Sequence, residues 1–580
     1  MSCTQWCLDA LFTNETEADK ALKEASERAQ SFETLMKGNL KNIRASDFLE
    51  SLRAYESILE LLGRVMTYAF LRFAKDANEG GFLAKYQQAT TLVHEKILFF
   101  ELEFNRLPKN TQRQFIEHAK PYQYYLESLQ EEKPHQLSQK EERILLKKST
   151  TSASAFSRLF DEHFSRLQFV YEGKKLSEEK VLSLLHDPSR DVRQKAATAL
   201  SKGLKPHQPL LAYIFNMIKQ DHATECELRE YKTPEEPRHK DNKISQKSVD
   251  ALVDATQARF DLVQEYYETK RVLLGYETLY DYDRYAPLGG EDETYTYDHS
   301  CEIVLNAFER FSPRFAQIAN DAFAQGWVDV YPEKGKRGGA FSHPATPNAH
   351  PYVLLNHTDK RRDVFTLAHE MGHAIHQYLS NGVGYLNGDT PLTTSETASV
   401  FAEMLVFDSI KEGLSGEKKQ QLLAGKIEDI FATLYRQINF TTFERRVHAH
   451  EGELSLETFN QYWNEESAKM FGPSVTLTKQ YEMWWSYIPH FIHTPFYCYA
   501  YSYGQLLVLA LYGLYKRGTC KDFVSRYGEF LSAGGSKSPR ELVALFGFDI
   551  DDEEFWQIGL GEVEALVREF KGGVDASRIS

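Results

Sequence analysis

Cysteine is scarce in this 580-residue chain: there are six, at positions 3, 7, 226, 301, 498 and 520, and no two form a CxxC pair. So few cysteines exclude a disulfide framework, and their spacing argues against a zinc ribbon or a redox dithiol. The N-terminal segment also lacks the basic start, apolar core and small-residue cleavage site of a signal peptide. We therefore expect a protein of a reducing compartment, the cytoplasm.

Positive charge is in short supply as well. The chain has 83 acidic and 68 basic side chains, a formal net charge of -15, and no long run of lysine and arginine. Phosphate backbones and anionic lipids require a positive surface, so we expect no nucleic-acid partner and no membrane partner. A long uncharged stretch, residues 496–515, contains six tyrosines, a serine and a glutamine. Because lipid cannot supply hydrogen-bond partners to these groups, the stretch predicts a buried helix rather than a membrane span.

Helical periodicity is abundant. From the N-terminus to about residue 205, apolar residues recur three and four positions apart, as in "FLESLRAYESILELLGRVMTYAFLRFAK", which predicts helix after helix. Between about 280 and 360, glycine, proline and aromatic residues replace this pattern. The short runs "GGAF" and "PYVLLN" predict strands at 338–341 and 351–356. Helical patterns then resume, so the expected fold class is mainly α with a small sheet.

One predicted helix carries several chemically active side chains. Residues 366–379 read "TLAHEMGHAIHQYL", and the helix is expected to end at "SNG" with Gly382 as its left-handed cap. His369 and His373 lie one turn apart, on the face away from the helix's apolar stripe, where two imidazoles can converge on one metal ion. Glu370 can accept a proton from a water on that ion. An HExxH pattern arises by chance in about a few per cent of such chains, so a helix with solvated or capped histidines is the alternative at this point.

The third histidine of this helix, His376, is not expected to be the third metal ligand. A catalytic zinc usually has three protein ligands and one open position. On an unbroken helix, His376 lies about 10.5 Å along the axis from His369, too far for both rings to reach one ion. Families that use a later histidine place a glycine-containing turn before it, whereas only Ala374 and Ile375 intervene here. We expect His376 to support the ligands or to pack.

Another segment offers the missing ligand. In "TTSETASVFAEML", Glu396, Ser399 and Glu403 fall on one face of a predicted helix. Glu396 would complete the ligand set, and Ser399 and Glu403 could orient a ligand histidine by accepting its second N–H. The same letters also fit a capping box from Thr393 to Glu396, in which the carboxylate would only satisfy a backbone amide. Spacing alone does not decide between ligand and cap.

These motifs resemble those of a known family. "HEMGHAIH" followed by "SETASVFAE" is similar to the HExGHxxH and ExxS patterns of the zinc metallopeptidases that include thimet oligopeptidase, neurolysin and oligoendopeptidase F. The resemblance runs from "DPSRDVRQKAATAL" to the C-terminal helices and is strongest to the oligoendopeptidase F subfamily. Further stretches that carry it, in the same order as in that subfamily, are "DRYAPLGG", "GKRGGAFS", "YVLLNHTDKRRDVFTLAHE", "RQINFTTFE" and "HFIHTPFYCYAYSYG".

The resemblance implies roles for individual side chains. It implies one zinc ion per chain, held by His369, His373 and Glu396. It makes Glu370 the general base. C-terminal side chains of the family stabilise the tetrahedral intermediate and bind substrate. The counterparts in this chain are expected among His490, His493, Tyr497 and Tyr501.

The resemblance also implies a fold and an activity. Residues 191–580 would form a zincin-type catalytic domain with a small sheet beside the HExxH helix, enclosed by a helical domain of residues 1–190. The implied activity is zinc-dependent hydrolysis of internal bonds in short unstructured peptides. Two alternatives stay open: a carboxypeptidase or dipeptidyl carboxypeptidase on the same scaffold, and a non-catalytic helical peptide-binding protein. The intact Glu370 argues against the second, because this residue can be lost without loss of zinc.

Overall fold

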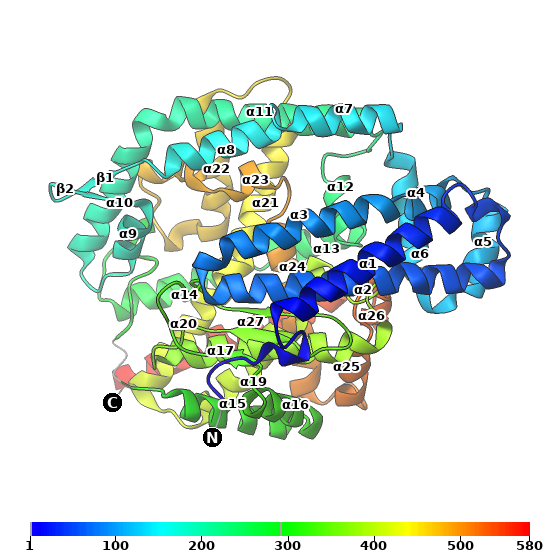
Figure 1. Cartoon of the computed structure of the whole chain (residues 1–580). Coiled ribbons are helices and arrows are strands. Elements are labelled where there is room, and N and C mark those ends of the chain that lie inside the picture. The colour runs from blue at the N-terminus through cyan, green and yellow to red at the C-terminus, as the bar shows by residue number, and fades with distance from the viewer. Residues whose placement is uncertain (1–2, 290–292, 580) are drawn as a thin grey trace. The chain divides into compact units, whose positions relative to one another are not determined.

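The computed structural model describes residues 3–289 and 293–579, a mainly α-helical chain with short strands (Figure 1). Gly290, the last residue of the "DRYAPLGG" stretch, lies outside the described residues. The chain forms two compact units, each built from three segments. Unit 1 comprises Met1–Lys133, Glu291–Glu412 and Cys520–Gly547, and unit 2 comprises Pro134–Gly290, Gly413–Thr519 and Phe548–Ser580. The expected domain boundary at residue 190 stays a prediction.

Three long helices open unit 1 and lie side by side: α1 (Glu15–Met36), α2 (Ala45–Lys75) and α3 (Gly80–Ile97). As its sequence predicts, α2 buries apolar side chains at three- and four-residue intervals: Phe48, Leu52, Tyr55, Ile58, Leu62 and Val65. Three shorter helices follow: α4 (Phe99–Arg106), α5 (Lys109–His118) and α6 (Gln123–Glu132). They contribute to an aromatic cluster in which Phe48 stacks on Phe100 and Phe115.

A three-stranded sheet forms the second part of unit 1, after α15 (Tyr297–Phe311) and α16 (Pro313–Ala324). Its strands are β3 (Val328–Asp329), β4 (Phe341–His343) and β5 (Tyr352–Leu354). The order is β3-β5-β4, with β5 parallel to β3 and antiparallel to β4. The strand predicted at "PYVLLN" contains β5, whereas the one predicted at "GGAF" shares only Phe341 with β4, which forms an edge of the sheet.

The helix that carries the HExxH motif is α17 (Arg361–Ser380), which is unbroken throughout. It begins where the Asp363 carboxylate accepts hydrogen bonds from the Thr358 and Lys360 amides at 2.8 and 3.0 Å. The predicted left-handed cap at Gly382 is wrong. A 3₁₀ turn (Asn381–Val383) continues the chain, and Gly384 adopts the positive φ of +84° instead.

Four more helices complete unit 1: α18 (Leu392–Ser395), α19 (Thr397–Glu412), α25 (Phe523–Ser532) and α26 (Pro539–Ala544). α19 packs along α17, and α25 supports both. The hydroxyl of Tyr527 on α25 donates a hydrogen bond to the Thr397 carbonyl at 2.9 Å, and its ring lies 4.5 Å from that of Phe401. The start of α19 is therefore held by a segment more than a hundred residues later in the chain.

Unit 2 is a second set of packed helices. They are α7 (Gln139–Ser149), α8 (Ala153–Phe164), α9 (Glu178–Ser183), α10 (Arg190–Leu204), α11 (Gln208–Leu228), α12 (Glu236–Asp241), α13 (Gln246–Gln257), α14 (Phe260–Leu273), α20 (Gly416–Thr433), α21 (Tyr435–Ala449), α22 (Leu456–Phe471), α23 (His490–His493), α24 (Tyr499–Arg517) and α27 (Glu553–Ile579). Their core is rich in aromatic rings, and Phe215 stacks on both Phe459 and Phe491. The hairpin of β1 (Phe169–Tyr171) and β2 (Lys174–Leu176) interrupts the predicted run of helices.

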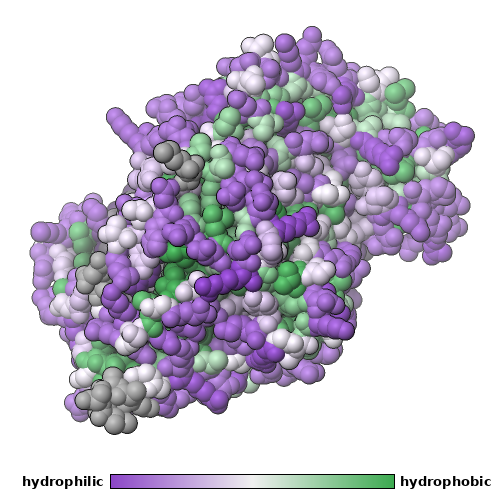
Figure 2. Space-filling view, turned by 90° about the horizontal axis from the view of Figure 1, so that it is seen from below, coloured by the Kyte–Doolittle hydropathy of each residue, from purple (hydrophilic) through white to green (hydrophobic). Residues whose placement is uncertain are grey.

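The uncharged stretch that predicted a buried helix forms most of α24, whose residues from Ser502 to Leu514 are buried. In the described part of the chain, no helix is long and apolar enough to cross a membrane. Figure 2 shows one face of the protein, where hydrophilic side chains predominate and hydrophobic ones appear between them.

Candidate metal centre

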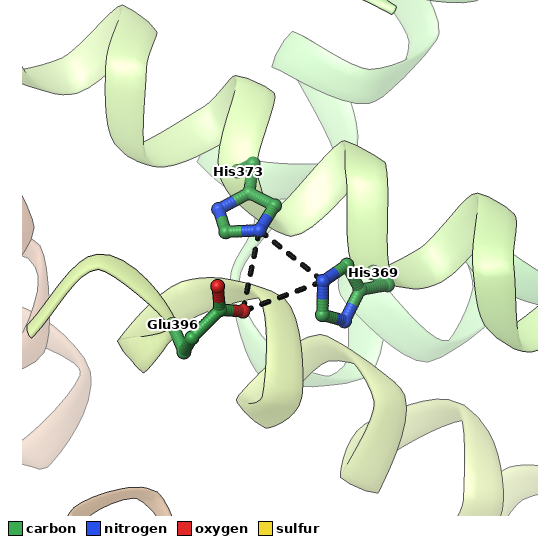
Figure 3. A group of neighbouring side chains, drawn as sticks. All are labelled: His369, His373 and Glu396. Atoms are coloured by element: carbon green, nitrogen blue, oxygen red, sulfur yellow. Dashed lines mark hydrogen bonds and ion pairs between the residues drawn. The ribbon is translucent and has the colours of Figure 1, made fainter. Parts of the chain in front are cut away.

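Helix α17 and the start of α19 bring three candidate metal ligands together (Figure 3). Nε2 of His369 lies 3.2 Å from Nε2 of His373. Oε2 of Glu396, which directly precedes α19, lies 3.4 Å from the first nitrogen and 3.3 Å from the second. The three donor atoms thus converge on one point. They come from the two segments that the sequence analysis singled out, the HExxH helix and "TTSETASVFAEML".

The spacing of these atoms fits a metal ion. Ligand atoms about 2.0–2.2 Å from a tetrahedral zinc lie roughly 3.3–3.5 Å from one another, which matches the observed distances of 3.2–3.4 Å. Two imidazoles and one carboxylate are also the donor set of catalytic zinc sites that keep a position open for water or substrate. The described residues therefore fit zinc in both geometry and chemistry.

Two side chains of α19 hold the candidate ligands in place. Oε1 of Glu403 accepts a hydrogen bond from Nδ1 of His369 at 2.7 Å, which leaves Nε2 as the unprotonated nitrogen of the neutral ring. Ser399 Oγ donates to Oε2 of Glu396 at 2.8 Å. Ser399 was expected to accept a hydrogen bond from the second N–H of a ligand histidine. It holds Glu396 instead, because that carboxylate lies beside the first turn of α19.

Helix α19 approaches α17 closely because residue 372 is glycine. A Cβ at Gly372 would overlap the Ala398 carbonyl oxygen and lie 2.6 Å from Ser399 Cα. A side chain here would have to push the start of α19 away. The close approach brings Glu396 and Glu403 within reach of the two histidines.

The electrostatics of the site favour a bound cation. Burial acts against charging His369, but the hydrogen bond and charge of Glu403, together with the charge of Glu396, raise its pKa to about 9. Burial raises the pKa of Glu370, and the two neighbouring imidazoles only partly oppose this shift. Three carboxylates around two imidazoles therefore stabilise positive charge at this point.

Glu370 and His376 line the same cavity as His369 and His373, with a volume of about 370 Å³. Glu370 is only 7% exposed and has no hydrogen-bond partner among the described residues, which leaves its carboxylate available to accept a proton. His376 is buried, and burial lowers the pKa of its imidazole to about 3. In the described chain His376 is outside the converging group, as the rise along the unbroken α17 predicts.

A glutamine of α17 was not expected from the sequence. Gln377 bonds to Ser342 of β4 twice: its Oε1 accepts from the serine hydroxyl at 2.7 Å, and its Nε2 donates to the serine carbonyl at 3.2 Å. These bonds tie the edge strand β4 to α17. The spacing of four residues from His373 was the available signal, because it places Gln377 on the same face of α17.

Three of the four C-terminal side chains expected to bind substrate lie together in unit 2. Nε2 of His490 is 3.3 Å from the Tyr501 hydroxyl, and the Tyr497 ring lies 6.0 Å and 5.1 Å from the rings of these two residues. His493 pairs with Asp161 of α8 at 2.8 Å instead. The part of these residues in catalysis stays a prediction.

Arginine 436 also belongs to this region, although the sequence reasoning did not single it out. Arg436 donates hydrogen bonds to the hydroxyls of Tyr285 and Tyr487 at 3.1 and 3.4 Å. Burial is the main cause that lowers the pKa of His490, and the positive charge of Arg436 is the second. Arg436 and Tyr285 fall within "RQINFTTFE" and "DRYAPLGG", so the stretches that carried the resemblance contained the signal.

Known proteins share both the sequence pattern and the fold. The family model described as peptidase family M3 matches residues 183–562, and the model described as oligopeptidase F matches residues 103–169. Oligopeptidase PepF of Bacillus subtilis (strain 168) is 28% identical over 593 residues, which cover 98% of this chain and 88% of the relative. An oligoendopeptidase F homolog of Lactococcus lactis subsp. lactis (strain IL1403) is 27% identical over 587 residues, which cover 97% of each chain.

A solved structure supports the fold. The crystal structure of oligoendopeptidase-F from Enterococcus faecium superposes with a TM-score of 0.71 at 22% identity, and covers 97% of this chain and 99% of its own. The mainly α fold and the family resemblance that the motifs predicted are thereby confirmed. Because the M3 family model spans more than half of its length, the chain belongs to peptidase family M3, a family of metallopeptidases.

Proposed function

We propose that this protein is a zinc-dependent oligoendopeptidase, with one zinc ion per chain, that hydrolyses internal bonds of short unstructured peptides. The observation that carries the proposal is the convergence of three candidate ligands beside the unpartnered carboxylate of Glu370. The names of the relatives, oligopeptidase and oligoendopeptidase F, support peptide substrates and internal cleavage. All six cysteines are free, which supports a cytoplasmic site of action.

The proposed mechanism assigns proton transfer to Glu370. Held by His369, His373 and Glu396, zinc would supply Lewis-acid chemistry, which lowers the pKa of a bound water to about 7 and stabilises negative charge on the substrate oxygen. Glu370 would accept a proton from the attacking water and later deliver it to the leaving amine. Its buried position keeps competing solvent away from this proton.

The C-terminal cluster would bind the substrate oxygen. His490, Tyr497 and Tyr501 offer one imidazole and two phenols as hydrogen-bond donors. A donor aimed at an oxyanion is worth about 10²–10³ in rate. In this proposal at least one member of the cluster donates to the developing negative charge.

The substrate backbone would pair with the edge strand β4. Ala340, Phe341 and Ser342 line the metal cavity, and Gln377 fixes Ser342 to α17. Hydrogen bonds to a strand edge engage main-chain groups, so they bind peptides of many sequences. The family resemblance implies that the metal centre lies in a channel. An extended peptide of about ten residues spans at most ~35 Å and could enter such a channel, whereas a folded domain could not.

Cleavage mapping tests the proposal. The zinc-loaded protein is incubated with a ten-residue peptide blocked at both ends, and the products are identified by mass spectrometry. Internal cleavage is the expected result. Cleavage of the unblocked peptide alone, by trimming from its C-terminus, would establish a carboxypeptidase. Zinc binding without cleavage of either peptide would contradict the proposal and leave a peptide-binding protein.

A second comparison tests the expected limit on substrate size. The same ten residues are placed in a buried strand of a stable folded protein, and the two rates of cleavage are compared. We expect the free peptide to be cleaved and the folded protein to stay intact. Equal rates would rule out an enclosed channel.

A further inference from the structure

A second cavity adjoins the metal centre within unit 1. Its volume of about 620 Å³ falls in the range of ~300–1,000 Å³ that is typical of small-molecule sites. The two cavities share four lining residues: Gln377, Ser380, Gly388 and Thr390. A substrate side chain in the second cavity would therefore lie next to a substrate segment bound at the metal centre.

The walls of this second cavity combine apolar and polar surface in similar amounts. Met66 and Phe70 of α2 and Leu83 of α3 line it on the side of the N-terminal helices, and Tyr385 lines it from the loop after α17. Tyr385 lies against α2 because residue 63 is glycine: a Cβ there would be 2.8 Å from two ring carbons of the tyrosine. This apolar part of the walls favours burial of an apolar group.

The charges around the cavity disfavour an anionic occupant. Its lining residues include no lysine or arginine, and Asp389 contributes a carboxylate. His343 does not supply a positive charge at neutral pH, since burial lowers its pKa to about 4. Its Nδ1 accepts a hydrogen bond from the Ala345 amide at 3.1 Å, so the neutral ring carries its proton on Nε2 and can donate from there.

We propose that this cavity selects one substrate side chain next to the cleaved bond, and that it favours large uncharged side chains, aromatic or aliphatic, over acidic ones. The inference rests on the proposed peptidase function. Met66 and Phe70 are then specificity-determining residues. The N-terminal helices, which carry no catalytic motif, contribute to catalysis by shaping this pocket. A hydrogen bond from His343 would position the side chain or the adjoining peptide group.

The test introduces a larger side chain into the cavity and measures which peptides the variant still cleaves. Wild-type protein and the Met66→Trp, Met66→Ala and Ala54→Trp variants are incubated with blocked decapeptides that vary one position at a time. Changes of one methylene in an apolar pocket alter kcat/KM by about 10–200-fold. At one position, Met66→Trp should therefore lower kcat/KM for phenylalanine, tyrosine and leucine at least about tenfold and leave alanine nearly unchanged. Met66→Ala should retain the large side chains.

Ala54 provides the matched control, because it is exposed on the same helix. The Ala54→Trp variant adds the same indole outside the cavity and should keep the wild-type profile. Melting temperature and zinc content of each variant verify that it folds and holds metal. If the folded and zinc-loaded Met66→Trp variant has the same cleavage preferences as the wild type at every peptide position, the proposed role of the pocket is contradicted.

A binding measurement separates this inference from the proposed function. Titration calorimetry with the Glu370→Gln background measures affinity for intact peptides that carry phenylalanine, alanine or aspartate at the selected position. Phenylalanine should bind most tightly, and adding Met66→Trp should remove this advantage. If no variant cleaves peptides yet binding follows this order, the pocket stands and the peptidase proposal fails. If peptides are cleaved but Met66→Trp changes neither the cleavage preference nor the peptide affinity, the proposed role of the pocket is contradicted.

Discussion

Gly372 of α17 lies directly against Ser399 of α19, so that a Cβ on the glycine would come within 2.6 Å of the serine Cα. This contact sets the distance between α17, which carries the two imidazoles, and the start of α19, where Glu396 and Glu403 lie within contact of them. The geometry of the metal centre therefore depends on a residue that has no side chain.

Replacing that glycine should weaken metal binding. In Gly372→Ala the start of α19 has to move, which carries Glu396 away from the histidines and costs roughly 1–3 kcal/mol in stability. Titration of zinc against a competing chelator measures the affinity. Gly425→Ala is the control, because Gly425 lies in a helix with no atom near its Cβ position. Equal zinc affinity in both variants would show that the close contact is dispensable.

Removing the proton acceptor should abolish turnover and retain the metal. Glu370→Gln keeps the size of the side chain and both imidazoles, but an amide cannot accept the proton of the attacking water. We expect near-stoichiometric zinc, measured by atomic emission, and a loss of about 10²–10⁴-fold in kcat by the usual magnitude for a general base. Substantial residual turnover would assign the proton to another group.

The third ligand can be identified by comparing two variants. Glu396→Ala removes one of three converging donor atoms, whereas His376→Ala removes a buried ring that lies outside the converging group. Zinc affinity should fall far more in the first variant than in the second, which is limited to the ~10–100-fold of a supporting contact. Weaker zinc binding by the His376 variant would require a different ligand set.

The hydrogen bond from His369 to Glu403 should contribute to metal affinity. In Glu403→Gln the amide oxygen can still accept a hydrogen bond from Nδ1–H of His369, but the negative charge that raises the basicity of the ring is gone. We expect about 10-fold weaker zinc binding for glutamine and up to ~100-fold for alanine. Identical affinities for the wild type and the alanine variant would contradict a supporting role.

Acid should destabilise the protein through His343. Because burial lowers its folded-state pKa to about 4, from a reference value near 6.5, the unfolded state binds more protons between these two values. The contribution to stability is therefore present above pH 6.5 and is lost as the pH falls towards 4. Urea unfolding at pH 7, 5.5 and 4 should show the wild type losing more stability than His343→Gln. Parallel curves would place the folded-state pKa near its ordinary value.

Two of the three candidate ligands could be predicted from local spacing. His369 and His373 follow from the helical period, and the rise of an unbroken helix separates His376 from them. Glu396 was ambiguous from spacing and became a predicted ligand only through the family resemblance. The contact at Gly372 could not be read from the sequence, since it depends on where α19 crosses α17.

The errors have local and long-range causes. The β1–β2 hairpin was missed within a helical region, although Glu172 and Gly173 at its turn, both with positive φ, form a recognisable two-residue connection. The helix cap was placed at Gly382 because the 3₁₀ turn that follows α17 delays the positive φ to Gly384. The second cavity was not foreseen because Met66 and Tyr385, more than three hundred residues apart, meet only in the folded unit.

The three-segment composition of unit 1 has a consequence for biosynthesis. The ring of Tyr527 on α25 packs on Phe311 and Phe401, and its hydroxyl holds the first residue of α19. The ribosome therefore releases both ligand-bearing segments long before the helix that supports them exists. Contacts between such distant segments form slowly and leave apolar surface exposed in the meantime. We therefore expect the candidate metal site to be completed late, and a nascent chain stalled before residue 520 to present the HExxH motif without the helix that supports the start of α19.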